Sequence, residues 1–143
     1  MKKLLLATVA SAAMATAVSA DDVKIGVFLG FTGPIESLVA QMGPGAEAAI
    51  AEVSASGSFM NGSTVTAVRA DTTCVDAGAA TAAAERLITS DKVSGIVGGD
   101  CSGVTTATLT NVAMPNGMVM ISPSATSPAL SPAPINSTFD APT

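Results

Sequence analysis

The chain has 143 residues, with 6 Lys+Arg against 11 Asp+Glu, a formal net charge of −5, two Cys, and no His, Trp or Tyr. Without an imidazole base, neither a Ser-His-Asp nor a Cys-His catalytic device can be built, and two sulfurs are too few for a structural zinc site. There is no basic run and little aromatic surface on which bases could stack. We therefore expect no metal ion, no cofactor and no nucleic-acid partner.

Residues 1–20 have the pattern of a secretory signal. Lys2 and Lys3 precede an apolar run over residues 4–18, and Val18-Ser19-Ala20 is a small-residue cleavage site. The alternative, a membrane helix, needs about 20 apolar residues, and this run is shorter. We expect cleavage before Asp21, export, and no membrane span afterwards. The loss of two lysines leaves a formal charge of −7.

The segment after the signal is long enough for one hydrophobic core but not for two lobes. We expect a single lobe over residues 21–130, followed by a proline-rich end at 131–143. The cysteines, Cys74 and Cys101, are expected to form a disulfide, because an even count in an oxidising compartment favours pairing. Two buried free thiols are the alternative.

Strands and helices alternate along this lobe. In chain order, apolar runs predict strands at residues 23–29, 64–70, 93–97 and 118–122, and apolar residues at helical spacing predict helices at 45–54 and 80–88, the second with Asp76 as N-cap. Residues 104–114 suit a strand or a helix, but a crossover between parallel strands is normally helical. Five prolines from Pro123 onward exclude a regular helix at the end. The pattern predicts an α/β fold with a doubly wound parallel sheet.

Three segments follow the predicted strands and could form a binding site, since ligands of such sheets bind beyond the carboxyl ends of the strands. They are residues 30–34, 100–103 and 122–126, and all are rich in glycine or hydroxyl groups. Residues 30–34 lack the spacing of a nucleotide-binding loop.

Two hydroxyl side chains in these segments have open interpretations. Ser102 stands where a helix begins, so its hydroxyl and the unpaired amides of that turn could bind a carboxylate, or the hydroxyl could simply cap the helix. Thr126 could address both ends of an amino acid, although spacing alone favours a turn-stabilising role.

The acidic residues at the strand ends allow weaker hypotheses. A pair of carboxylates could do acid–base work, but Asp76 is more simply an N-cap. Asp71 and Asp100 could bind a hard cation, yet the Asp/Asn ladder of a calcium loop is missing.

The order of these segments resembles a known family. The stretches IGVFLGFTGPIESL, GAEAAIAEVSASG, VRADTTCVDAGAATAAAERLITSDKVSGIVGGDCSG and GMVMISPSATSPAL are similar to the amino-terminal lobe of the periplasmic leucine/isoleucine/valine-binding proteins. These are the receptors of branched-chain amino-acid ABC importers. The resemblance covers about residues 23–130 and implies one lobe of a type I periplasmic-binding-protein fold.

The resemblance also implies roles for individual residues. Ser102 would bind the ligand carboxylate, and the backbone carbonyl of Asp100 would accept from the ligand ammonium. Thr126 would use its N–H for the carboxylate and its hydroxyl for the ammonium, beside the carbonyl of Ser124. Leu38 stands where the family often has an aromatic residue against the ligand side chain. The family also bridges the cysteines at these positions.

We therefore expect an exported, non-enzymatic solute-binding protein whose partner is an ABC permease and whose ligand is a small, branched-chain amino acid. The family is a two-lobed clamp, so the chain resembles a fragment with one wall of the cleft. A regulatory or chemosensory amino-acid-binding lobe is the alternative, and a small hydrolase using Ser102 with Asp100 is a third hypothesis.

Overall fold

Four parallel strands form the centre of the fold. The computed structural model describes residues 21–131, so the predicted signal sequence and residues 132–143 lie outside the described residues. The sheet has the order β2-β1-β3-β4, and all its strand pairs are parallel. The strands are β1 (Asp22–Leu29), β2 (Thr64–Asp71), β3 (Gly95–Gly98) and β4 (Met120–Ile121). The predicted α/β fold with a doubly wound parallel sheet is confirmed.

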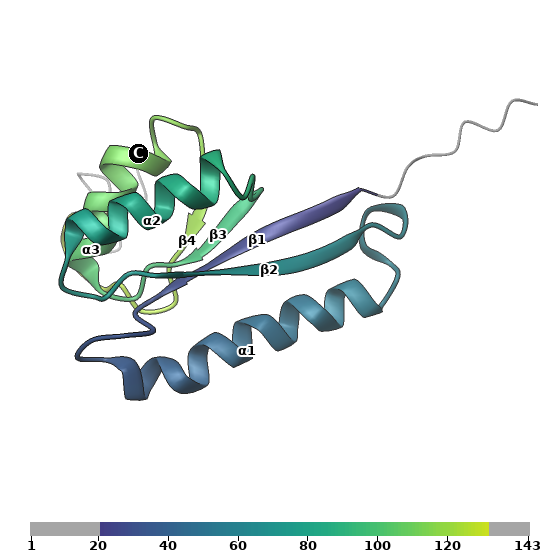
Figure 1. Cartoon of the computed structure of the whole chain (residues 1–143), viewed down its shortest axis with the longest axis horizontal. Helices are drawn as coiled ribbons and strands as arrows, with labels where there is room; N and C mark the ends of the chain where they lie inside the picture. Colours follow the sequence, from purple (N-terminus) through teal and green to yellow (C-terminus); the bar gives the residue numbers. More distant parts are fainter. Residues whose placement is uncertain (1–20, 132–143) are drawn as a thin grey trace, which may run out of the picture.

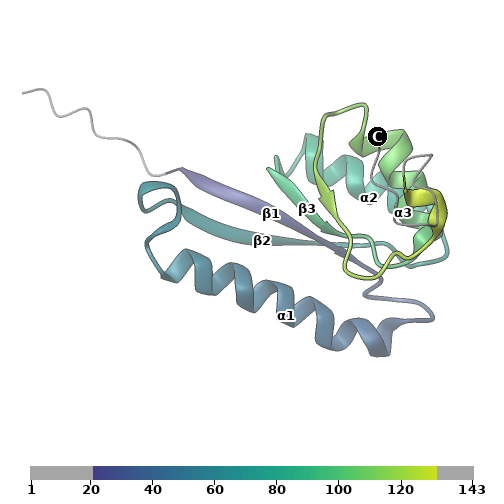
Figure 2. The same ribbon diagram turned by 180° about the vertical axis from the view of Figure 1, so that it is seen from behind.

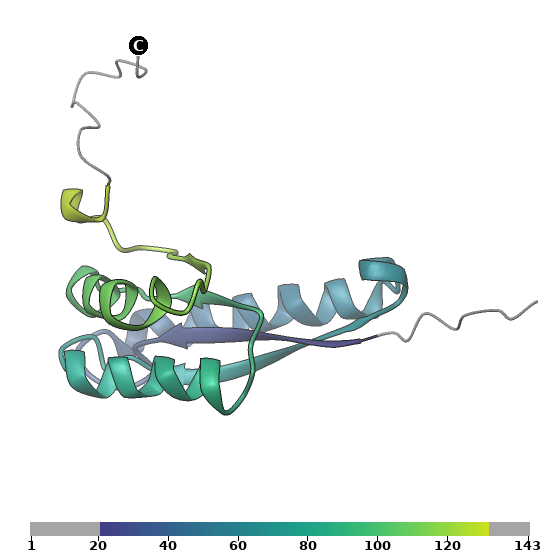
Figure 3. The ribbon, with the colours of Figure 1, turned by 90° about the horizontal axis from the view of Figure 1, so that it is seen from above.

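The helices divide between the two faces of this sheet (Figure 1). Helix α1 (Glu36–Ala55) covers one face, whereas α2 (Ala77–Thr89) and α3 (Ser102–Thr108) cover the other, as the view from above shows (Figure 3). Right-handed crossovers explain the division. The chain steps from β1 to β2 in one direction and from β2 through β3 to β4 in the other, so the connecting helices fall on opposite faces.

Two apolar cores follow from this layering. Phe28 and Leu87 are fully buried in the larger core, between the sheet and α2 and α3. Val27, Leu29 and Val39 form the smaller core, between β1 and α1. Successive side chains of a strand point to opposite faces, so β1 contributes to both cores and is the central strand of the fold.

Helix α1 is longer than the predicted 45–54 segment. It begins at Glu36 and runs through Pro44, which has no N–H for an intrahelical hydrogen bond. The added turns bury Val39 and bring Met42 against the smaller core. Burying one such side chain stabilises by about 1.5–3 kcal/mol, which offsets the cost of an interior proline.

The next two helices agree with the predictions. Asp76 is the N-cap of α2, and its carboxylate accepts a hydrogen bond from the Ala79 amide at 2.9 Å. The ambiguous 104–114 segment is helical: α3 begins at Ser102 and continues into a wider π-helical turn, Leu109–Ala113. The topological argument for a helix is therefore correct.

The third and fourth strands begin later than predicted, because the chain is still turning at their expected starts. The Val93 amide donates to the carbonyl of Leu87 at 3.0 Å, and the Met118 amide donates to the carbonyl of Ala113 at 2.9 Å. Both bonds reach back to the preceding helical segment. Between Pro123 and Ser131, the last stretch that the structure describes, the helical structure is a short 3₁₀ turn, Pro128–Leu130.

Part of the sheet face on the side of α1 is uncovered in residues 21–131. Helix α1 runs along β1 and β2 (Figure 2). On the β3–β4 half of the same face, Val97 is half-buried and its register partner Ile121 is 67% exposed. An apolar groove of about 310 Å³ lies along the boundary, lined by Val97 and Ile25 of the sheet and by Val53 of α1, among others.

Candidate functional site

The three segments singled out in the sequence meet at one edge of the sheet. All four strands are parallel, so their carboxyl ends share this edge. Side-chain hydrogen bonds join the segments across it: Gly30 to Asp100, Ser124 to Asp100, and Thr126 to Ser102. Loops that are far apart in the sequence therefore form one continuous surface.

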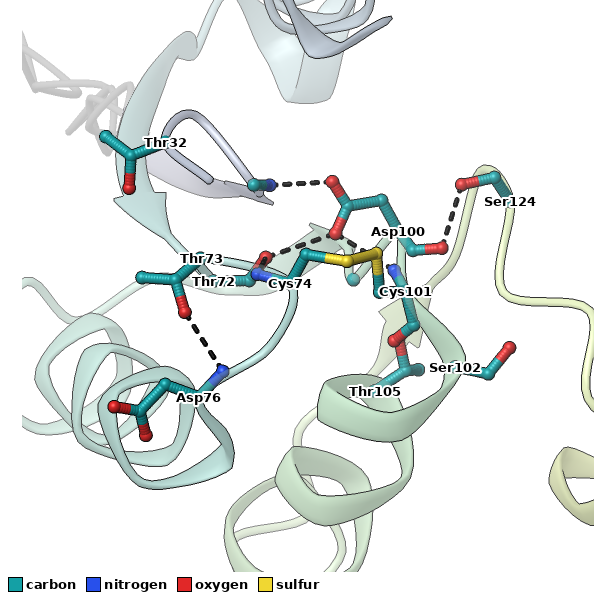
Figure 4. The surroundings of a disulfide bond; sticks show 12 residues. Thr32, Thr72, Thr73, Cys74, Asp76, Asp100, Cys101, Ser102, Thr105 and Ser124 are labelled. Atoms are coloured by element: carbon teal, nitrogen blue, oxygen red, sulfur yellow. Dashed lines mark hydrogen bonds between the residues drawn. A yellow bond between two sulfur atoms is a disulfide. The ribbon is translucent and has the colours of Figure 1, made fainter. Parts of the chain in front are cut away.

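Asp100 lies at the centre of this surface and is 5% exposed. Its Oδ2 accepts from the Gly30 amide at 2.6 Å, and its Oδ1 accepts from the Thr72 hydroxyl at 3.1 Å and from the Cys101 amide at 3.0 Å (Figure 4). Its backbone carbonyl accepts from the Ser124 hydroxyl at 3.0 Å. A buried carboxylate is costly unless it is hydrogen-bonded, and these donors satisfy both of its oxygens.

The hydroxyl of Ser102 is turned towards the loop after β4. The N-cap of α3 is Cys101, and Ser102 is the first residue of the helix. Ser102 Oγ accepts from the amides of Thr126 at 3.1 Å and Ser127 at 3.2 Å. The interpretation of Ser102 as the helix cap is therefore wrong. With two donors on its oxygen, the hydroxyl still has its own proton to donate.

The hydrolase hypothesis finds no support in these contacts. It needs the Asp100 carboxylate to act on the Ser102 hydroxyl. The carboxylate instead accepts from Gly30, Thr72 and Cys101, and Ser102 Oγ accepts from the loop after β4.

The predicted disulfide between Cys74 and Cys101 is confirmed, with a distance of 5.3 Å between the two Cα atoms. It joins the loop after β2 to the N-cap of α3, immediately before Ser102 (Figure 4). The alternative of two free thiols is wrong. The bridge fixes the start of α3 from one side, while the hydrogen bonds of Asp100 hold it from another.

Asp71, at the end of β2, organises the turn after β1. Its carboxylate accepts from the Thr32 hydroxyl at 2.5 Å, from the Thr32 amide at 3.3 Å and from the Thr73 amide at 2.8 Å. Partial burial alone would raise the pKa of Asp71, but hydrogen bonds from Thr32, Thr73 and Phe31 outweigh it and hold this pKa below its ordinary value of 3.8. Asp71 therefore ties two loops together rather than offering a free carboxylate to a cation.

The lowered pKa of Asp71 predicts acid-dependent stability. A group whose pKa is lower in the folded state stabilises the protein above its unfolded pKa, and this contribution is lost as the pH falls through the folded value. We expect Asp71→Asn to unfold more easily than the wild type at pH 7, and the two free energies of unfolding to converge below pH 3.8. Urea unfolding at several pH values measures this. Thr32→Val removes one of the donors to Asp71 and should therefore reduce the pH dependence of the free energy of unfolding. If the wild type and Asp71→Asn differ by the same free energy of unfolding at every pH, the predicted contribution of Asp71 is wrong.

Leu38 lies in the first turn of α1, where 66% of its side chain is exposed. Within residues 21–131, no group of three or more Cys, Asp or Glu side chains is placed to hold a metal ion. In the same range, none of the helices combines the length and hydropathy needed to span a bilayer.

One cavity lies behind the loop after β4. It has a volume of about 180 Å³ and is lined mainly by apolar side chains, among them Leu109, Met120 and Leu130. The predicted ligand-binding residues are not among its lining residues. Ser122, which does line the cavity, donates to the carbonyl of Gly99 at 2.5 Å and so connects the loop after β4 to the end of β3.

Comparison with known proteins identifies the family. A family of periplasmic binding proteins matches residues 22–139, so the chain belongs to this family. The Leu/Ile/Val/Thr-binding protein of Salmonella typhimurium is 33% identical over 128 residues, which cover 90% of the chain and 34% of that protein. The Leu/Ile/Val-binding protein of Escherichia coli K12 is 31% identical over the same shares. The chain thus spans about a third of the length of these relatives.

Solved structures agree with this result. A branched-chain amino acid transporter substrate-binding protein from Streptococcus pneumoniae, in complex with isoleucine, superposes with a TM-score of 0.69 at 31% identity, covering 76% of this chain and 30% of that one. A leucine-binding protein from Thermotoga maritima gives a TM-score of 0.57 at 28% identity, covering 75% and 29%. The fold is therefore one lobe of a type I periplasmic binding protein, and the relatives are substrate-binding proteins rather than enzymes.

Proposed function

We propose that this protein is the exported substrate-binding component of an ABC importer and that it binds a branched-chain amino acid. The contact between Ser102 and the loop after β4 carries the proposal, because it brings together hydroxyl and amide groups suited to a zwitterion. Relatives named for leucine, isoleucine and valine binding match 90% of the chain and support this ligand class. The described lobe supplies one wall of the site.

The ligand carboxylate would lie at the start of α3. The Ser102 hydroxyl has a proton to donate, and the amides of the first helical turn have no partner inside the helix. The Thr126 amide now donates to Ser102 Oγ at 3.1 Å. A carboxylate is a stronger acceptor than a hydroxyl, so the ligand would take over this amide and remain beside Ser102.

The ligand ammonium would lie next to it, among acceptors. The Asp100 carbonyl accepts one hydrogen bond, from Ser124, and has a second lone pair for the ammonium. The Thr126 hydroxyl and the Ser124 carbonyl complete this proposed set. Leu38, which is 66% exposed, offers an apolar surface for an aliphatic side chain.

Titration of the isotope-labelled protein with leucine, isoleucine and valine, followed by NMR, tests the ligand. We expect shifts concentrated at the amides of Ser102 and Thr126. A hydrogen bond to a charged group contributes about 1.5–3 kcal/mol, so Ser102→Ala should raise the Kd about tenfold to a hundredfold.

Ser94→Ala is the matched control, because Ser94 is exposed and precedes β3 at the opposite edge of the sheet. It should bind as the wild type does. 4-Methylpentanoate, which lacks the ammonium group, should bind more weakly than leucine. Shifts that avoid both Ser102 and Thr126 up to the solubility limit of each amino acid would contradict the proposal.

The export and transport parts have separate tests. The mass of the protein in the periplasmic fraction should correspond to a chain that begins at Asp21. Retention of residues 1–20 would contradict export through signal cleavage. Leucine uptake by cells that is unchanged after deletion of the gene would count against a role in an importer.

A further inference from the structure

The carboxylate of Asp100 connects segments that are far apart in the sequence. Its Oδ2 binds the amide of Gly30, 70 residues away, and its Oδ1 binds the hydroxyl of Thr72, 28 residues away. Oδ1 also accepts from the Cys101 amide at 3.0 Å. One buried side chain thus holds the chain at the ends of β1, β2 and β3.

The same residue is connected to the loop after β4 through its backbone. The Asp100 carbonyl accepts from the Ser124 hydroxyl at 3.0 Å, and the next residue but one, Ser102, accepts from the Thr126 and Ser127 amides. Any rotation of the peptide between Asp100 and Cys101 would displace both contacts. The position of this loop therefore depends on how firmly Asp100 is held.

We propose that Asp100 is a positioning residue, whose carboxylate fixes the ends of three strands so that Ser102 meets the loop after β4. The relevance to a ligand rests on the proposed function, but the placement of the loop does not. The family resemblance implies a role for Asp100 only through its backbone carbonyl, as an acceptor for the ligand ammonium. The structure adds a separate role for its side chain, directed towards the protein.

The chemistry of this position requires a carboxylate. Three donors point at two oxygens, and an ionised carboxylate accepts on both. An asparagine would replace one oxygen by an NH₂ group, which would face the Gly30 amide or the donors on Oδ1. At least one buried donor would then lose its acceptor, and the loop ends would move apart to reach water.

Amide hydrogen exchange in the complete protein tests the proposal without any ligand. We expect Asp100→Asn to raise the exchange rates of Thr126 and Ser127 about tenfold to a hundredfold relative to amides in the centre of β1, the effect of losing one buried hydrogen bond. Asp71→Asn is the matched control, because the Asp71 carboxylate also accepts several hydrogen bonds at a strand end but holds the Thr32 turn. Asp71→Asn should leave the exchange rates of Thr126 and Ser127 unchanged relative to the amides in the centre of β1.

A milder pair of variants covers the case in which Asp100→Asn does not fold. Thr72→Val keeps the shape but removes the hydroxyl, which donates to Asp100 Oδ1 at 3.1 Å and accepts from the Cys74 amide at 3.2 Å. It should accelerate exchange at Thr126 and Ser127 about threefold to tenfold. Thr72→Ser restores the hydroxyl and should restore protection. Exchange at Thr126 and Ser127 that changes only in step with the centre of β1, or equally in Asp71→Asn, would overturn the proposal. If the variants show the expected changes in exchange but the wild type does not bind leucine, the proposed function is overturned and the positioning role of Asp100 is not.

Discussion

Replacing Cys74 and Cys101 together by serine is expected to lower the free energy of unfolding by about 3–4 kcal/mol. The bridge closes a long loop, with a sequence separation of 27, so its loss frees many conformations of the unfolded chain. It also releases the N-cap of α3 from the loop after β2. Because a domain is stable by only about 5–15 kcal/mol, such a loss is a large part of the total.

Urea unfolding of the oxidised and reduced protein measures this effect. Reduction of the wild type should shift the midpoint as far as the double substitution does, whereas the double variant should not respond to the reductant. An equal stability of oxidised and reduced protein would show that other contacts alone hold the loop after β2 to α3.

Leu87→Ala is expected to destabilise the protein by about 2–5 kcal/mol, as large-to-small substitutions in cores do. Leu87 is fully buried on α2 and lies directly on β1: a Cβ built at Gly26 would come within 2.9 Å of its Cδ1 atom. Gly26 leaves the space into which the leucine side chain packs. Truncation to alanine would therefore leave a cavity against the central strand.

Leu38→Ala is the matched substitution, because Leu38 is 66% exposed. Its free energy of unfolding should lie within about 0.5 kcal/mol of the wild type. Thermal or urea unfolding of both variants makes the comparison. Similar losses in the two would mean that the α2 face of the sheet does not form the main core. In the ligand titrations, by contrast, Leu38→Ala is the variant expected to alter the preference among aliphatic side chains.

The arrangement of the elements could be predicted because the sequence is locally consistent. β-Branched runs give β1 and β2 almost to the residue, and Asp76 gives the start of α2. The start of α1 could not be predicted in this way, because Pro44 is a poor helix residue and only tertiary burial of Val39 extends the helix past it. The late starts of β3 and β4 likewise depend on hydrogen bonds back to the preceding helical segments.

The meeting of the three loop segments at one edge of the sheet could also be predicted, but the contacts between them could not. Parallel strands bring their carboxyl ends to one edge whatever the side chains do. The direction in which a hydroxyl points cannot be predicted in this way, because its hydrogen-bond partner lies far along the chain: Ser102 Oγ accepts from the amide of Thr126, 24 residues away. The sequence marked the Asp100 carboxylate as a possible cation ligand or catalytic group, but its buried contact with the Gly30 amide could not be predicted, because no local pattern indicates which distant donor an acid will accept from.

The part of the sheet face that residues 21–131 leave uncovered has a consequence for how the chain behaves in concentrated solution. Val97 and Ile121 present apolar surface beside an edge strand of two residues, which is too short to recruit another strand efficiently. Mutual repulsion of molecules with a formal charge of −5 then opposes clustering through this surface. That repulsion vanishes near the isoelectric point of about 4.3, so the protein should aggregate most readily in mildly acidic buffer. At neutral pH, added salt should screen the repulsion and favour aggregation as well.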